Sequence, residues 1–209
     1  MTTHDDLVAA GARLAASGIS PGTSGNVSVR DGDHVYMTGT GTDLGALRPS
    51  QIARLDPDGR HVDGPTPSKE VAMHLAVYRR NPDLTAAVHV HSANATAVSC
   101  LAPWSERSAI PPITPYFVMR VGRTPLIPYR HPGDPALGTL IEELPDPFRA
   151  VLLANHGQVV AAEDLGAAVA AAVELEEACR MTLLTLGHNP RLLSDTDAAE
   201  LAARSGMPW

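Results

Sequence analysis

Three histidines could meet at one metal ion. His89 and His91 alternate with valine in an apolar run typical of a buried strand, and side chains two residues apart lie on the same face of a strand. His156 lies between Asn155 and Gly157, where a turn interrupts a second apolar run. Three neutral imidazoles with an open fourth position form the usual arrangement of a catalytic zinc site. A His-x-His pair alone is more often structural, so His156 is what makes a metal site the preferred hypothesis.

Glu70 could add a carboxylate to this group. It falls in the first turn of a helix that we predict to begin after Pro67, with Ser68 as the capping residue. The alternative, which Glu70 taken alone favours, is a carboxylate that only stabilises the positive end of the helix dipole. His74 follows one turn later, and we expect a packing or surface role for it. The remaining histidines have no comparable neighbours: His4, His34, His61, His131 and His188.

Three short segments could bind an oxyanion. Two are glycine-rich turns at 22–26 and 38–41, and the third is Ser68 with Lys69 at the predicted helix start. Backbone N–H groups in such turns, together with a helix N-terminus, bind anions without a high net charge, and Lys69 adds a positive charge. Each segment could also be an ordinary turn. The sequence lacks the G-x-x-x-x-G-K-[ST] pattern, which argues against a nucleoside triphosphate as the ligand.

The elements that must position these residues alternate between helices and strands. We predict helices from Thr3 to Gly18, at 69–80, at 93–101 and from 164 to about 186. We predict strands at 26–30, 34–38, 86–90, 151–154 and 159–160, with β-like pieces at 116–121 and 126–129. This order indicates an α/β protein, and the hairpin predicted at 31–33 makes the sheet at least partly antiparallel.

Length and composition limit the classes of protein that fit. A chain of 209 residues, 44% of them hydrophobic, suits one compact domain, residues 1–209. The net charge of −7 argues against nucleic acid as a partner. We find neither a leader-like start nor an apolar stretch of membrane-spanning length, so we expect a cytoplasmic protein with no membrane partner. Cys100 and Cys179 form no close-spaced pair, as expected in a reducing compartment.

Five segments, in this order, resemble motifs of the class II aldolase/adducin family: GTSGNVSVR at 22–30, TGTG at 38–41, PSKE at 67–70, AAVHVHS at 86–92 and LLANHG at 152–157. The resemblance covers nearly the whole chain. It implies a three-layer α/β/α sandwich around a largely antiparallel central sheet. It also implies Zn²⁺, or another divalent ion such as Mn²⁺ or Co²⁺, and a homotetramer with active sites at the subunit interfaces.

The same resemblance implies roles for individual residues. His89, His91 and His156 correspond to the metal ligands, and Glu70 corresponds to the catalytic acid/base. Tyr116 falls near the family's mobile tyrosine acid, but the neighbouring Pro115 leaves the register open, and a packed aromatic is the alternative. The phosphate-binding set corresponds to Gly25, Asn26, Thr40, Gly41, Ser68 and Lys69.

Longer segments resemble one branch of the family, the 3-oxo-tetronate 4-phosphate decarboxylases: residues 67–82, 113–134 and 152–160. Aldolases such as fuculose-phosphate aldolase typically have a second serine where this chain has Lys69. We therefore predict a metal-dependent lyase acting on a small phosphorylated sugar acid. The expected products, formed through a metal-stabilised enediolate, are dihydroxyacetone phosphate and CO₂.

Three alternatives remain. A class II aldolase would cleave a ketose 1-phosphate through the same enediolate, and its aldehyde oxygen would need a proton donor such as Tyr116. A substrate carboxylate instead needs a cationic or polar partner, for which Arg120, Arg123 and Arg130 are candidates, although each could also be a solvated surface residue. A non-catalytic, adducin-like binding protein would not need the three histidines and Glu70. A zinc hydrolase is not supported, because no His-Glu-x-x-His pattern is present.

Overall fold

A sheet of eight strands runs through the protein, whose computed structural model describes residues 2–209. The strands are β1 (Asn26–Asp31), β2 (His34–Thr38), β3 (Ile52–Leu55), β4 (His61–Asp63), β5 (Ala86–Val90), β6 (Leu126–Ile127), β7 (Ala150–Leu153) and β8 (Gly157–Ala162). Their order in the sheet is β4-β3-β2-β1-β5-β8-β7-β6, and every pairing is antiparallel except that of β6 with β7. The prediction of a largely antiparallel sheet is confirmed.

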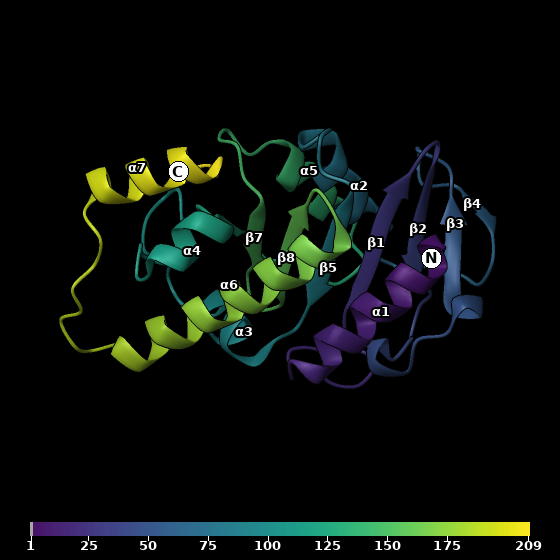
Figure 1. The fold of residues 1–209 in the computed structure, drawn as a ribbon, viewed down its shortest axis with the longest axis horizontal. Coiled ribbons are helices and arrows are strands. Elements are labelled where there is room, and N and C mark those ends of the chain that lie inside the picture. Colours follow the sequence, from purple (N-terminus) through teal and green to yellow (C-terminus); the bar gives the residue numbers. More distant parts are fainter. Residues whose placement is uncertain (1) are drawn as a thin grey trace.

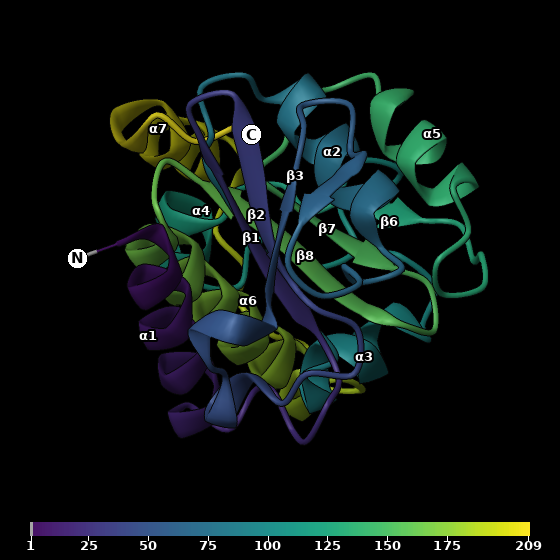
Figure 2. The ribbon, with the colours of Figure 1, turned by 90° about the vertical axis from the view of Figure 1, so that its right-hand side faces the viewer.

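Helices cover both faces of this sheet. One face carries α1 (Thr3–Ala16), α3 (Ala93–Ser99), α4 (Pro115–Arg120), α6 (Leu165–Thr185) and α7 (Asp195–Ser205), and the other carries α2 (Val71–Arg80) and α5 (Ala136–Glu142). Figure 1 shows α1 and α6 in front of the strands, and Figure 2 shows the sheet between the two groups of helices. The α/β/α sandwich that the family resemblance implies is confirmed.

The central strands divide their side chains between two hydrophobic cores. In β5, Ala86, Val88 and Val90 belong to the core under α1 and α6, whereas Ala87 belongs to the core under α2. Because strand side chains alternate between faces, His89 lies on the α2 side. The one polar residue of β5, His89, therefore faces the layer that contains α2.

Within residues 2–209, no helix is both long and apolar enough to cross a membrane.

Residues 115–120 form a helix, α4, so the prediction of a β-like piece at 116–121 is wrong. The Thr114 side chain accepts a hydrogen bond from the backbone N–H of Phe117 (3.1 Å), and Pro115 occupies the first helical position. A capped start with proline in the first turn favours a helix even for aromatic and β-branched residues. The β-like piece predicted at 126–129 is present as β6.

Two strands and two α-helices lie outside the sequence prediction, β3, β4, α5 and α7, as do two short 3₁₀ helices at Leu44–Ala46 and Pro49–Gln51. α7 has recognisable signals, because the Ser194 hydroxyl accepts from the Asp197 backbone N–H (3.1 Å) and Gly206 ends the helix with φ of 66°. Thr2 and Asp5 form the capping box of α1.

Candidate active site

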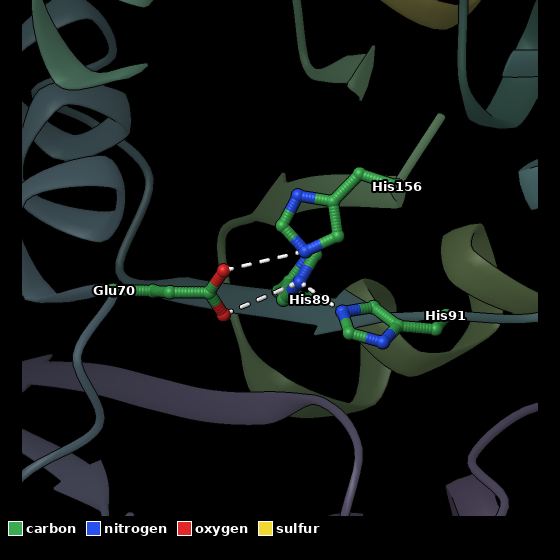
Figure 3. Close-up of side chains that lie close together, drawn as sticks. All are labelled: Glu70, His89, His91 and His156. Atoms are coloured by element: carbon green, nitrogen blue, oxygen red, sulfur yellow. Dashed lines mark hydrogen bonds and ion pairs between the residues drawn. The ribbon is translucent and has the colours of Figure 1, made fainter. Parts of the chain in front are cut away.

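The ends of neighbouring strands bring the three predicted metal ligands together. His89 is in β5 and His91 follows it, whereas His156 lies in the turn between β7 and β8. β8 pairs with β5, which places this turn beside the end of β5. Glu70 joins them, and each of the four residues offers a ligand atom within 4.8 Å of the others (Figure 3). This group of four is hereafter called the His₃Glu cluster.

The donor atoms of the His₃Glu cluster point toward one another. The Nε2 atoms of His89 and His91 are 2.9 Å apart, and Glu70 Oε2 is 3.3 Å from His89 Nε2. Glu70 Oε1 is 3.4 Å from His156 Nε2. Both ring nitrogens of His156 and Oε1 of Glu70 are buried without a hydrogen-bond partner, a costly arrangement for polar atoms. Converging imidazole and carboxylate groups fit a divalent cation, which would coordinate the Nε2 atom of His156.

Glu70 lies at the N-cap position of α2, because this helix begins at Val71. The prediction that Ser68 caps a helix starting at Lys69 is therefore wrong, and Glu70 precedes the first turn instead of lying in it. Its carboxylate makes no capping hydrogen bond and instead accepts one from the Asn26 side-chain amide (2.7 Å). The helix start thus directs Glu70 toward the histidines, and its side chain does not serve as a cap.

A backbone contact orients the ring of His89. The Nδ1 atom of His89 lies 2.8 Å from the carbonyl oxygen of Gln158, which can only accept a hydrogen bond. Nδ1 must therefore carry the proton, which leaves a lone pair on Nε2, the atom that faces His91 and Glu70. Contacts of this kind are how proteins present a histidine to a metal ion.

Two glycines allow the loops to approach these strands closely. A Cβ atom on Gly25, which has φ of 95°, would lie 2.7 Å from the carbonyl oxygen of His89. A Cβ atom on Gly157 would lie 2.6 Å from the carbonyl oxygen of Val90 and 3.2 Å from the Cα atom of His91. Neither space admits a side chain. Glycine is therefore required for the 22–26 turn and for the start of β8 to pack against the end of β5.

Burial keeps the site histidines neutral. Desolvation lowers the pKa of His89 to about 3 and holds the pKa of His91 and of His156 below the ordinary value, with Glu70 opposing the shift in each case. Burial alone would raise the pKa of Glu70, but His89, the amide of Asn26 and His156 together bring it below its usual range. At neutral pH the cluster is thus one carboxylate beside three uncharged imidazoles, the protonation states that metal binding requires.

We expect the metal-free protein to lose stability as the pH falls below about 6.5. His74, His89, His91 and His156 have folded pKa values below 6.5, so the unfolded chain binds more protons than the folded chain. Their contribution to the free energy of unfolding is complete above the pKa of histidine in the unfolded chain. It is lost as the pH falls through the pKa values of the folded protein. For His74, with a pKa of about 4, the complete loss corresponds to roughly 3 kcal/mol.

Urea unfolding of chelator-treated protein between about pH 7 and pH 4.5 measures this effect. The His74→Gln variant is the comparison, because its stability should fall less over the same interval. An unfolding free energy that stays constant across this range would contradict the prediction.

A cavity of about 200 Å³ adjoins the His₃Glu cluster, and Glu70 and His91 form part of its wall. The three segments predicted to bind an oxyanion meet here. All six residues of the predicted phosphate-binding set line the cavity: Gly25, Asn26, Thr40, Gly41, Ser68 and Lys69. Sequence reasoning missed Pro132 and Gly133, which complete the wall and have no recognisable ligand-binding signal. The structure thus brings the predicted anion-binding segments and the predicted metal ligands to one place.

Tyr116 does not line this cavity. It lies on α4 with 55% of its surface exposed, and the guanidinium of Arg120 lies 5.2 Å from its ring centroid. Arg120 also faces Glu174 (3.5 Å), and Arg123 lies against the ring of Trp209 (5.4 Å). Arg130 is exposed and lies two residues before the cavity wall at Pro132. Among the three candidate arginines, Arg130 is therefore nearest in sequence to the cavity.

The fold and the His₃Glu cluster define a class of protein. The chain belongs to the family described as the class II aldolase and adducin N-terminal domain, whose model matches residues 5–183. A 3-oxo-tetronate 4-phosphate decarboxylase from Pectobacterium atrosepticum is 40% identical over 198 residues, covering 94% of this chain and 91% of that protein. Other proteins of that name are 36% to 43% identical.

More distant relatives have a different name. An L-fuculose phosphate aldolase from Methanocaldococcus jannaschii is 34% identical over 165 residues, covering 79% of this chain and 87% of that protein. Among solved structures, YgbL from Escherichia coli superposes with a TM-score of 0.90 at 38% identity, covering 95% of this chain and 97% of that one. The predicted family and the resemblance to its decarboxylase branch are confirmed.

Proposed function

We propose that this protein is a metal-dependent carbon–carbon lyase that decarboxylates 3-oxo-tetronate 4-phosphate to dihydroxyacetone phosphate and CO₂. One observation carries the proposal: Glu70 and His91 belong to the His₃Glu cluster and also form part of the wall of the cavity lined by the anion-binding segments. A substrate with a phosphate at one end and a reacting carbon at the other would place the phosphate in the cavity and the carbon beside the His₃Glu cluster. The identity of 36% to 43% to decarboxylases of that name supports the choice of substrate.

His89, His91 and His156 would hold the metal ion, and we propose Zn²⁺, with Mn²⁺ or Co²⁺ as alternatives. When bound, such an ion supplies a Lewis acid that withdraws electron density from the substrate oxygens. The phosphate of the substrate occupies the adjacent cavity. Backbone N–H groups, hydroxyls and the ammonium of Lys69 bind it there, through Gly25, Asn26, Thr40, Gly41, Ser68 and Lys69.

Glu70 supplies the proton chemistry. Decarboxylation breaks the bond between the carboxylate carbon and C2, so CO₂ leaves and the electron pair remains on C2, delocalised onto the 3-oxo oxygen. A proton must then be added at C2. Glu70 is ionised at neutral pH, so it first takes up a proton from the solvent and then delivers it to C2, directly or through a water molecule, which returns Glu70 to the carboxylate. The Oε1 atom of Glu70 has no hydrogen-bond partner, so it is free for this transfer.

The second candidate function is a class II aldolase, which the 34% identity to an L-fuculose phosphate aldolase favours. Lys69 argues against it, because aldolases of the family typically have serine there. In the aldolase reaction we propose that Tyr116 donates the proton to the aldehyde oxygen and that it acts from a neighbouring subunit of a homotetramer. Its 55% exposure and its absence from the cavity of its own chain support this assignment.

The two functions differ in their second product. Metal-loaded protein is incubated with 3-oxo-tetronate 4-phosphate and, separately, with a set of ketose 1-phosphates, while CO₂ and aldehyde are measured independently. We expect CO₂ and dihydroxyacetone phosphate from the first substrate and little aldehyde from the others. Aldehyde release without CO₂ would replace the decarboxylase with the aldolase, and absence of both products would contradict the proposed lyase.

A further inference from the structure

A chain of hydrogen-bonded side chains runs from the interior of α2 to Glu70. The Tyr78 hydroxyl lies 2.7 Å from Ser28 Oγ, which lies 2.7 Å from His74 Nδ1. His74 Nε2 lies 2.6 Å from Asn26 Oδ1, and Asn26 Nδ2 lies 2.7 Å from Glu70 Oε2. All five residues are buried, and His74 has no exposed surface. The chain connects the space between the sheet and α2 with the His₃Glu cluster.

The carboxylate determines the direction of every bond in this chain. An ionised Glu70 only accepts, so Asn26 must present its NH₂ group to Glu70 and its carbonyl oxygen to His74. His74 must then donate from Nε2, which leaves Nδ1 as an acceptor for the hydroxyl of Ser28. Ser28 in turn accepts from Tyr78. One arrangement of protons therefore satisfies all four contacts.

We propose that His74 is a positioning residue, which acts through Asn26 to hold the carboxylate of Glu70 toward the three histidines. Without a donor at His74, the carbonyl oxygen of Asn26 would be buried and unpaired, and rotation of its amide would turn an oxygen toward Glu70. Two oxygens would then repel, and Glu70 would leave its position. This inference rests on the proposed function, because it assigns Glu70 its place in that reaction.

Burial agrees with this role. Desolvation lowers the pKa of His74 to about 4, so the ring is neutral at neutral pH. A neutral ring has one donor and one acceptor, as its hydrogen bonds to Asn26 and Ser28 require. Apolar side chains could fill the space between β1 and α2 without the cost of desolvating five polar groups. From the sequence we predict a packing or surface role for His74. His74 instead makes polar contacts with Asn26 and Ser28, which lie 48 and 46 residues away in the sequence. The spacing of Glu70 and His74 could not reveal these contacts.

Substitutions at His74 test the role. His74→Phe removes the donor and keeps a ring, and we expect kcat to fall by about 10- to 100-fold while metal content and KM change little. His74→Gln keeps an N–H that can reach Asn26, and we expect it to recover most of the lost activity. Val77→Ala, at another buried position of α2, is the control for loss of packing and should lower the melting temperature without lowering kcat.

The role is wrong if His74→Phe keeps the wild-type kcat, or if His74→Gln is equally impaired. A decrease in kcat for Val77→Ala as large as that for His74→Phe would also overturn it, because destabilisation alone would then explain the effect. Should His74→Phe fail to fold, the tautomer of His74 in the wild type decides, because the role requires a proton on Nε2 facing Asn26, and an impaired His74→Gln would overturn it as well.

Nitrogen NMR of the metal-free wild type gives a readout that needs no substrate. In ¹⁵N-labelled protein at neutral pH, we expect His74 to be the neutral tautomer with its proton on Nε2. A proton on Nδ1, or a charged ring, would overturn the inference. If the wild type turned over neither substrate class, the proposed function would fail. The tautomer measurement would still show whether His74 donates a hydrogen bond to Asn26, on which its positioning role depends.

Discussion

Glu70→Gln is expected to lower kcat by about 10²- to 10⁴-fold, the range that general acid–base groups contribute, and to leave the metal content largely intact. Glutamine has nearly the shape of glutamate but can neither take up nor deliver a proton at neutral pH. Glu70 is only 8% exposed and its Oε1 atom is unpaired, so we expect no nearby group to replace it. Three imidazoles remain to bind the ion. Steady-state turnover and elemental analysis of the same sample measure both effects.

The matched control is Glu163→Gln. Glu163 is an exposed carboxylate paired with Arg149 (2.9 Å) and lies outside the His₃Glu cluster, so its replacement should change neither turnover nor metal content. Normal turnover in Glu70→Gln would remove Glu70 from the mechanism. Loss of metal together with activity would instead make Glu70 a ligand, with its role in proton transfer unproven.

His89→Ala is expected to abolish both metal binding and turnover. His89 is fully buried, its Nε2 atom faces both His91 and Glu70, and the Gln158 carbonyl fixes its ring. The variant would keep only two imidazoles, and a catalytic zinc site normally has three protein ligands. Elemental analysis should find the metal-to-protein ratio close to zero, and activity should not return when Zn²⁺, Mn²⁺ or Co²⁺ is added.

His61→Ala is the control for this prediction, because His61 is exposed on the edge strand β4 and lies outside the cluster. It should bind metal and turn over substrate as the wild type does. Circular dichroism of both variants separates loss of ligand from loss of fold. A folded His89→Ala protein that keeps a full equivalent of metal would show that the ion binds elsewhere.

Local spacing was enough to select most of the residues that the structure brings together at the candidate site. His89 lies in β5 and His91 directly follows it, and because side chains alternate along a strand, their spacing of two predicts that both lie on one side of the sheet. The turns at 22–26 and 38–41 follow from glycine, whose backbone adopts conformations closed to other residues. Helix α6 likewise begins where the Asp164 side chain caps it, accepting from Ala167 N (2.7 Å). These properties depend on a few consecutive residues, so the sequence by itself determined them.

The sequence prediction of secondary structure was wrong where neighbouring residues favour different elements. The aromatic and β-branched residues at 116–121 favour a strand, but the cap at Thr114 and the proline after it favour a helix, and the helix forms. The position of Glu70 shows the same limit. Ser68 is a residue type that often caps helices, yet α2 begins three residues after it, at Val71. Glu70 therefore lies before the helix, and its carboxylate faces the histidines.

Only the tertiary structure decided which distant side chains meet. Asn26 and Glu70 are 44 residues apart and Asn26 and His74 are 48 apart, yet they contact one another because β1 pairs with β5 and places Asn26 opposite His89. Strand order and register result from the packing of both cores at once, and no segment of a few residues contains that information. The candidate metal ligands were therefore evident from the sequence, whereas the series of hydrogen bonds that links Glu70 to His74 was not.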